Sequence, residues 1–175
     1  MDPWRYAVNL AASETERKEV AALVNAGFTG KWMPFIATGH IKQMWADLVG
    51  ATEEGRLGWK AMVAADPAAG KDVAVCVHTK DWRGQDDVAR VLVELRALGI
   101  DQRLSYQEET ATRILLQGKG PSLYVAGPGK DDFTQRREAC TTQERHIHSG
   151  SSGPEVERTV AELFARSEPY GPFHT

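Results

Sequence analysis

The stretch RLGWKAMVAADPAAGKDVAVCVHTK, residues 56 to 80, is the part of the sequence that decides the fold. Its two ends are rich in residues that favour strands, and PAAGK between them is typical of a turn. Because successive side chains of a strand point to opposite faces, Val73, Val75 and Val77 share one face. The stretch therefore predicts an antiparallel hairpin with one apolar face.

The second face of this hairpin is polar. Cys76, His78 and Lys80 alternate with the valines, and Lys60 on the first strand is out of phase with its apolar neighbours. A solvated sheet face normally carries such residues, so one interpretation is an ordinary surface. The imidazole of His78, whose usual pKa is near neutral, favours the other interpretation, a binding or catalytic site.

Helical and strand patterns flank the hairpin. SETE at 13–16 predicts a capped helix that ends near Gly27, and further helices are expected at 39–55 with Thr38 as cap, at 84–100 and from Pro154. Strands are expected at 30–38, 103–117 and 121–127. Hairpin-linked strands with helices on one side predict an α+β architecture in which one sheet face is uncovered.

The chain is expected to form one domain of four consecutive parts. Residues 1–12 are interpreted as a poorly ordered lead, and residues 13–126 as the core. Residues 127–153 are interpreted as a polar loop segment that can act as a lid, and residues 154–175 as a C-terminal helix and tail of the same domain.

Composition limits the classes of partner. The 175 residues include 42% hydrophobic and 26% charged residues, and the net charge is −3, so no global basic field attracts bulk nucleic acid. Two cysteines form no disulfide framework, and no apolar run reaches the roughly 20 residues of a membrane span. We expect a cytoplasmic protein that is not inserted in a membrane, and any anion site must be local.

The uncovered face is expected to hold a cationic site for phosphate or carboxylate. Lys60 and His78 are the candidate catalytic residues. The candidate ligand-binding residues are Lys80, Arg103, Lys71, Arg113 and Tyr124, with Trp82, or Trp32, as a stacking platform.

Two further features are assigned no chemistry. HIH at 146–148 places two imidazoles on one face of an expected strand, but a metal site needs three or four ligands, so we assign no metal and no cofactor. Cys140 lies in a polar stretch without an identifiable base, which disfavours a catalytic thiol.

Several motifs occur in the order found in a known family. They are GKWM at 30–33, Trp45, GRLG at 55–58, VCVHTKDW at 75–82, DDVARVLVELRALGI at 86–100 and SYQEETAT at 105–112. Over roughly residues 28 to 126 the chain resembles the basophilic leukaemia-expressed protein family, whose fold is similar to that of the cap-binding translation initiation factor 4E. The resemblance implies a curved antiparallel sheet, with helices on the convex face and a ligand groove on the concave face.

The resemblance also implies two kinds of ligand. In the initiation factor, two tryptophans and a glutamate hold methylated guanine, and basic residues hold the phosphates. Here Lys71 fits one basic position, Ala64 stands at another, and no Trp-Glu pair separates Trp45 from Trp59. Members of the resembling family are also labelled phosphothreonine-lyase-like, which implies a lysine base and a histidine acid.

Two functions of different classes are therefore expected. The first is a metal-free lyase that eliminates phosphate from a small phosphorylated substrate or phosphoamino acid, with Lys60 as base and His78 as acid. The alternative is a noncatalytic module that binds a nucleotide, cap-like or phosphorylated ligand. The sequence leaves the substrate and the oligomeric state open.

Overall fold

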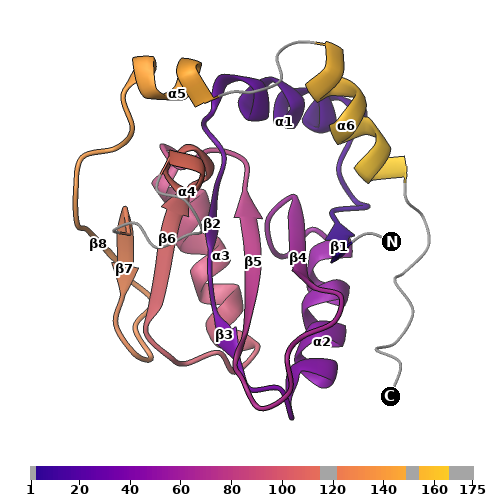
Figure 1. Cartoon of the computed structure of the whole chain (residues 1–175), viewed down its shortest axis with the longest axis vertical. Helices are drawn as coiled ribbons and strands as arrows, with labels where there is room; N and C mark the ends of the chain where they lie inside the picture. The colour runs from indigo at the N-terminus through magenta and orange to yellow at the C-terminus, as the bar shows by residue number, and fades with distance from the viewer. Residues whose placement is uncertain (1–2, 115–121, 149–153, 166–175) are drawn as a thin grey trace.

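The computed structural model describes residues 3–114, 122–148 and 154–165. Eight strands form one antiparallel sheet in the order β1-β4-β5-β2-β6-β7-β8, and β3 also pairs with β5 (Figure 1). The strands are β1 (Trp4–Val8), β2 (Gly30–Trp32), β3 (Phe35–Ile36), β4 (Lys60–Ala64), β5 (Val73–Thr79), β6 (Leu104–Glu108), β7 (Tyr124–Ala126) and β8 (Thr134–Gln135).

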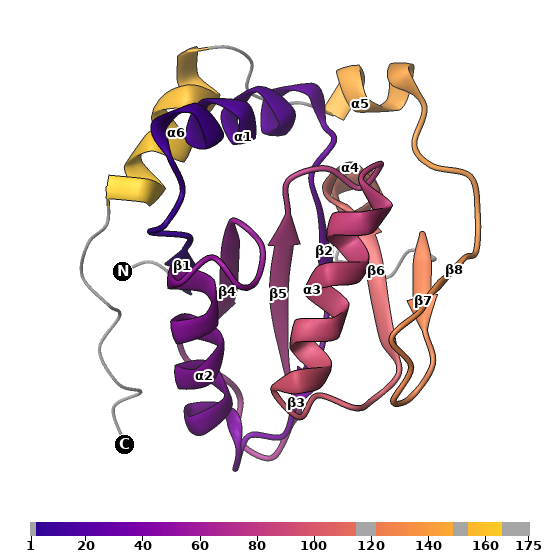
Figure 2. The same cartoon turned by 180° about the vertical axis from the view of Figure 1, so that it is seen from behind.

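Helices cover one sheet face and one end of the sheet. They are α1 (Glu14–Ala26), α2 (Ile41–Glu53), α3 (Gln85–Ala97), α4 (Glu109–Ile114), α5 (Thr142–His148) and α6 (Pro154–Ala165). Figure 2 shows α2 and α3 lying along the same face, whereas α1, α5 and α6 lie across the end of the strands. The predicted α+β class, with a curved antiparallel sheet and helices on its convex face, is confirmed.

The main core lies between the sheet and helices α2 and α3. Val75 and Val77 have no solvent exposure, and they share this core with Leu48 of α2 and Leu92 of α3. Full burial of each such side chain contributes roughly 1.5–3 kcal/mol. The valine face predicted from alternation is therefore the face that holds the two helices against the sheet.

Helix α1 begins as its sequence predicts. The amide of Glu16 donates to Ser13 Oγ at 3.1 Å, the amide of Ser13 donates to Glu16 Oε2 at 2.8 Å, and Gly27 ends the helix at φ 75°. Its buried residue Val20 shares a second, smaller core with Phe164 of α6. No helix in the described ranges is both long enough and apolar enough to span a membrane.

Three predicted boundaries were wrong near the start of the chain. Residues 4–8 are not a disordered lead, because β1 pairs with the outer edge of β4 and buries Val8. The single strand expected at 30–38 breaks at Pro34, which lacks a donor, into the central strand β2 and the short β3. Thr38 does not cap α2, whose N-cap is His40; the Thr38 hydroxyl donates to the carbonyl of Lys71 instead.

The long strand expected at 103–117 was also wrong. The last pair between β2 and β6 is Gly30 with Glu108, and beyond it no partner strand continues. The amide of Glu109 donates to the carbonyl of Thr29 at 2.9 Å, and the chain then turns into α4. A helix satisfies its own backbone groups, which is why it replaces the strand where pairing ends.

The segment 127–153 is more ordered than a polar loop in its described part. It contains β8, which pairs with β7, and α5. Arg137 Nη1 donates to Glu108 Oε2 at 3.1 Å, and this ties the segment to the end of β6. The HIH motif lies in α5 and not in a strand, and its imidazoles lie outside the described side chains.

Candidate functional site

Three basic side chains stand in one line across the centre of the sheet. Lys31 of β2 and Lys60 of β4 are the direct cross-strand partners of His78 of β5, one on either side. We call Lys31, His78 and Lys60 the basic row. Gln107 of β6 continues the line beyond Lys31, and Val8 of β1 continues it beyond Lys60.

The row is largely buried. His78 is 2% exposed and Lys31 is 6% exposed. One carboxylate oxygen serves both residues, because Glu109 Oε2 lies 3.2 Å from Lys31 Nζ and 3.8 Å from His78 Nδ1. The Nε2 atom of His78 is buried and has no hydrogen-bond partner among the residues that the structure describes. A buried imidazole nitrogen without a partner is costly, which marks this position as one that a ligand can complete.

Lys60 is the more accessible member of the row. It is half-buried, and its Nζ lies 4.8 Å from the ring centroid of Trp59 and 5.9 Å from that of Tyr6. The ring of Trp59 also lies 6.2 Å from the ring of His78. The structure therefore brings together the two residues that the sequence suggested as a catalytic pair.

Gly58 sets the spacing between the strands at this point. A Cβ atom on Gly58 would lie 1.7 Å from the carbonyl oxygen of His78, so no side chain fits there. The next amide, that of Trp59, donates to the same oxygen at 3.1 Å. A glycine at this position lets β4 approach β5 closely enough to place Lys60 beside His78.

The electrostatics of the row keep His78 uncharged. Burial lowers the pKa of His78 well below its usual value, and the charges of Lys60 and Lys31 lower it further. Imidazolium, the acid expected from the sequence, is therefore disfavoured in the ligand-free protein. Burial likewise raises the pKa of the neighbouring Cys76 thiol, which keeps it protonated.

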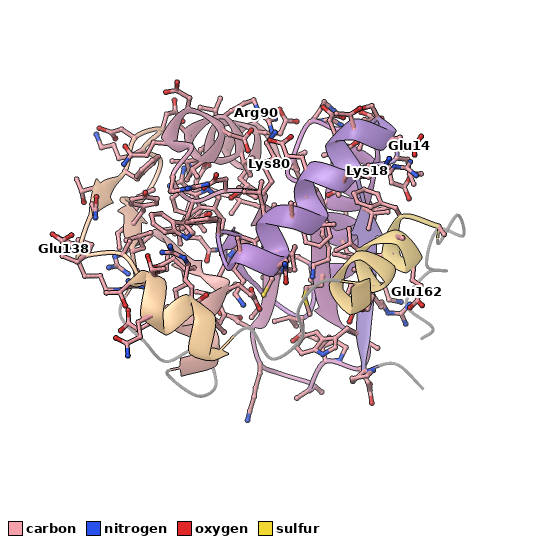
Figure 3. All side chains as sticks on the ribbon, turned by 90° about the horizontal axis from the view of Figure 1, so that it is seen from above. Glu14, Lys18, Lys80, Arg90, Glu138 and Glu162 are labelled. Atoms are coloured by element: carbon pink, nitrogen blue, oxygen red, sulfur yellow. The ribbon has the colours of Figure 1, made fainter. Side chains whose placement is uncertain are left out.

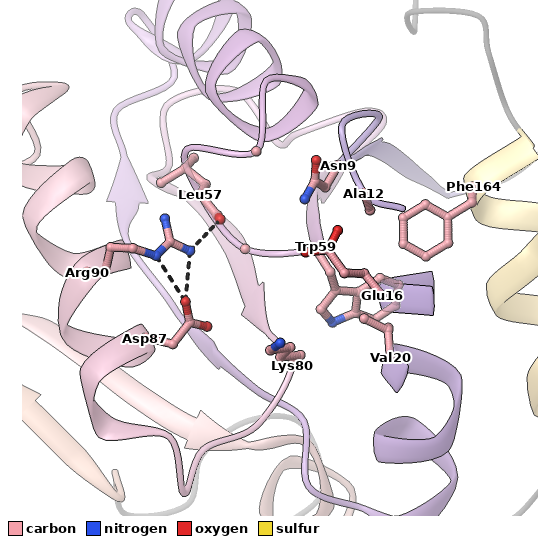
Figure 4. A pocket seen from close by; sticks show the side chains of 12 residues that line it. Asn9, Ala12, Glu16, Val20, Leu57, Trp59, Lys80, Asp87, Arg90 and Phe164 are labelled. Carbon is pink, nitrogen blue, oxygen red and sulfur yellow. Dashed lines mark hydrogen bonds and ion pairs between the residues drawn. The ribbon is translucent and has the colours of Figure 1, made fainter. Parts of the chain in front are cut away.

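Lys80 does not join the row, contrary to the sequence-based expectation. It follows the end of β5, and its Nζ lies 3.1 Å from Glu19 Oε2 of α1. Together with Trp59 and Arg90 it lines a separate cavity of about 160 Å³ (Figure 4). Figure 3 shows Lys80 and Arg90 beside each other next to α1. Strand alternation does not apply to Lys80 because the strand has ended.

Two other expected phosphate ligands are too far away. Arg103 is exposed and precedes Gln107 by four residues, roughly 13 Å along a strand. Lys71 is exposed in the hairpin turn, seven residues before His78, which corresponds to roughly 23 Å. Arg103 is in phase with Gln107 but lies too far along the chain, whereas Lys71 lies outside β5, in the connection that precedes it.

The expected aromatic ligands belong to the packing. Tyr124 is 2% exposed, and its hydroxyl donates to the carbonyl of Trp82 at 2.9 Å. Trp82 packs against the core and against Phe28, with 5.9 Å between the ring centroids. Trp32 is fully buried, and its Nε1 donates to the carbonyl of Val88 at 3.1 Å. Tyr124 and Trp32 therefore offer no open stacking face, Trp82 is half-buried, and the side chain of Arg113 lies outside the described ones.

Sequence reasoning missed Lys31 and Glu109. Lys31 alternates with the core residue Trp32, so strand phase was a usable signal. Glu109 was unrecognised because the strand was expected to continue through it. Among the described residues, no three histidine, cysteine or acidic side chains gather in a way that could hold a metal ion.

Comparisons with known proteins bear on the fold and the family. A solved structure with a similar arrangement is eIF4E-3 of Ascaris suum, crystallised in complex with an m2,2,7G cap. It shares 23% sequence identity and a TM-score of 0.40, over 49% of this chain and 53% of that chain. The family model described as basophilic leukemia-expressed protein Bles03 matches residues 8–114, more than half of the chain. The chain therefore belongs to the Bles03 family.

Proposed function

We propose that this chain binds a small phosphorylated ligand through the basic row, without chemical change to the ligand. The observation that carries the proposal is the direct opposition of Lys31, His78 and Lys60 across three strands. Lys31 and Lys60 bring two ammonium groups to the row, on either side of His78. Lys31 is 6% exposed, and an ammonium group in such a largely desolvated place attracts an anion more strongly than at a solvated surface.

A phosphate group fits the donors that the row offers. Its oxygens accept from the ammonium groups of Lys60 and Lys31, and His78 protonated at Nε2 donates to a third oxygen. The ligand would thereby partner the one imidazole nitrogen that has no partner in the described structure. A dianion at this position also raises the pKa of His78, because opposite charges favour the imidazolium form.

The test is a thermal-shift and calorimetric titration with inorganic phosphate, phosphothreonine and adenosine monophosphate. A ligand at 100 times its Kd adds about 2.7 kcal/mol to stability, a clear rise in Tm. Lys60→Gln is expected to weaken binding of the effective ligand at least tenfold. Lys71→Gln, which removes an exposed lysine far along the hairpin, is the matched control and is expected to bind like wild type.

The proposal is wrong if none of the phosphorylated compounds stabilises the protein. It is also wrong if one of them binds equally well to wild type and to Lys60→Gln, because the anion then lies elsewhere.

A phosphate-eliminating lyase is a second proposal, which the contact between Lys60 and His78 supports. In this reaction the neutral amine of Lys60 takes the α proton of a phosphoamino acid. The electron pair of the Cα–H bond forms a Cα=Cβ double bond, the Cβ–O bond breaks, the phosphate leaves with the electrons of that bond, and His78 supplies a proton to it. The ligand phosphate must first charge His78, because the ligand-free imidazole is neutral.

The two proposals give opposite results for one variant. A module that anchors phosphate through Lys60 loses binding in Lys60→Gln and releases no phosphate from phosphothreonine. A lyase that uses Lys60 as its base loses turnover in Lys60→Gln but retains most of its ligand affinity. Phosphorus NMR of wild type incubated with phosphothreonine, followed by calorimetry of the variant, separates them.

A further inference from the structure

The carboxylate of Glu109 engages the ammonium group of Lys31, which an anionic ligand at the basic row would also need. Its Oε2 atom contacts Lys31 Nζ at 3.2 Å and lies 3.8 Å from His78 Nδ1. Both partners are almost closed to solvent, with 8% and 3% of their side-chain surfaces exposed. A buried ammonium group needs a counter-ion, and in the described structure Glu109 supplies it.

Glu109 itself is less enclosed than the groups it contacts. Its side chain is 28% exposed, and it is the first residue of α4, beyond the last paired residue of β6. Its backbone is held by a hydrogen bond from its amide to the carbonyl of Thr29, at 2.9 Å. The Oε2 atom that faces the row is buried, and the exposed part of the side chain is the remainder.

We propose that Glu109 is a tethered competitor for the ligand anion, and that it makes the row selective for dianions over monoanions. The inference rests on the proposed binding of a phosphorylated ligand at the basic row. A tethered carboxylate competes at an effective concentration in the millimolar range, so an incoming group must interact more strongly than one negative charge does. A phosphate monoester, with a charge of about −1.5 to −2 at pH 7, meets this condition. A sulfate monoester of the same shape carries one charge and does not.

The experiment compares phosphothreonine with threonine O-sulfate by calorimetry at fixed ionic strength. Wild type is expected to bind the phosphate compound at least tenfold more tightly than the sulfate compound. Glu109→Gln keeps the side-chain size and removes the competing charge. It is expected to bind both compounds more tightly, with the larger gain for the sulfate, so that the selectivity ratio falls several-fold.

A matched control is Glu138→Gln. Glu138 is exposed and lies at the outer margin of the molecule, far from α1 (Figure 3). Its removal changes the net charge by the same amount and is expected to leave affinity and selectivity at their wild-type values. An equal gain in Glu138→Gln would show a general charge effect and would overturn the proposal.

Glu109→Gln leaves Lys31 without its carboxylate, so the variant will be less stable. The second variant is Glu109→Asp, which keeps the charge on a side chain shorter by one methylene group. Like Glu109→Gln, it is expected to lower the selectivity for the phosphate compound over the sulfate compound. Phosphothreonine is also expected to raise the Tm of Glu109→Gln more than that of wild type, because it replaces the missing counter-ion.

The outcomes distinguish failure of the proposed role of Glu109 from failure of the proposed binding function. Equal affinities and ratios in wild type and both Glu109 variants overturn the role of Glu109 but leave the binding function intact. Absence of binding in wild type and in every variant overturns the binding function and the inference with it. Binding by Glu109→Gln alone, with none by wild type, would overturn both, because the natural chain would then hold a closed ion pair and not a phosphate site.

Discussion

Arg137 donates hydrogen bonds to both carboxylate oxygens of Glu108, a residue with no solvent exposure at the end of β6. The backbone amide of Cys140 donates to the same carboxylate at 2.8 Å. Burial alone would raise the pKa of Glu108, but the hydrogen bonds from Arg137 and Cys140 outweigh it and the pKa is lowered. The polar segment after β8 is therefore fixed to the sheet by an ion pair.

Removal of Arg137 should destabilise the protein strongly. Arg137→Ala leaves the Glu108 carboxylate buried without its partner, for which a loss of about 3–5 kcal/mol is expected in urea denaturation. The exposed neighbour Arg136 gives the control Arg136→Ala, which should change stability by less than about 0.5 kcal/mol. The double variant Glu108→Gln with Arg137→Ala should lose less than the sum of the two single variants. Additive losses would show that the pair is not coupled.

Gly58→Ala should disrupt the close approach of β4 to β5. The added methyl group would lie 1.7 Å from the carbonyl oxygen of His78, a backbone atom that cannot move aside alone, so we expect a loss of at least about 3 kcal/mol. Gly50→Ala is the opposite case, because Gly50 lies within α2 with open space around it. It should stabilise the protein by up to about 1 kcal/mol. Similar stabilities of the two variants would contradict the register described for these strands.

His78 should make stability depend on pH between about 7 and 5. The pKa of His78 is lowered in the folded state, so below the usual value of 6.5 the unfolded chain binds a proton that the folded chain does not. Stability is then present above pH 6.5 and falls as the pH falls, by at most about 1.4 kcal/mol per pH unit from this group. His78→Gln should flatten this part of the profile. A profile unchanged by His78→Gln would show that His78 is not held neutral.

Both cysteines should resist alkylation in the folded protein. Burial, followed by the charge of Glu108, raises the pKa of Cys140 to about 12, and burial raises the pKa of Cys76. At pH 8 only about one Cys140 in ten thousand is a thiolate, the form that reacts. Mass spectrometry after brief iodoacetamide treatment should show no modification in buffer and two modifications in urea. Rapid native labelling of Cys140 would show that its contact with Glu108 opens readily.

Local periodicity predicted the elements that decide the architecture. The valines of β5 and the apolar stripe of α3 follow from alternation and helical spacing, and both lie in the core as expected. The Ser13 capping box is a similarly local signal. These features were predictable because neighbouring residues alone determine them.

Features set by distant partners were not predictable in this way. β1 forms because β4 offers an unpaired edge, and β6 ends at Glu108 because β2 begins opposite it, at Gly30. Within the site, alternation identified Lys60 and His78, whose strands are adjacent in sequence. Alternation predicts which face a side chain lies on but not how far along the sheet it lies, so it did not show that Arg103 is distant from the row. It also gave no reason to place Glu109 at the start of a helix.

The central place of β2 affects the order in which the protein can fold. β4 and β5 follow one another in the chain and are joined by the loop at 65–72, so a chain that has formed only this hairpin already has Lys60 beside His78. Lys31 arrives only when β2 enters between β5 and β6, from far away in the sequence. Such nonlocal pairing is slow compared with hairpin formation. If the basic row binds phosphate as proposed, the gain of that affinity during refolding would mark the arrival of the central strand, a later event than burial of the hairpin valines.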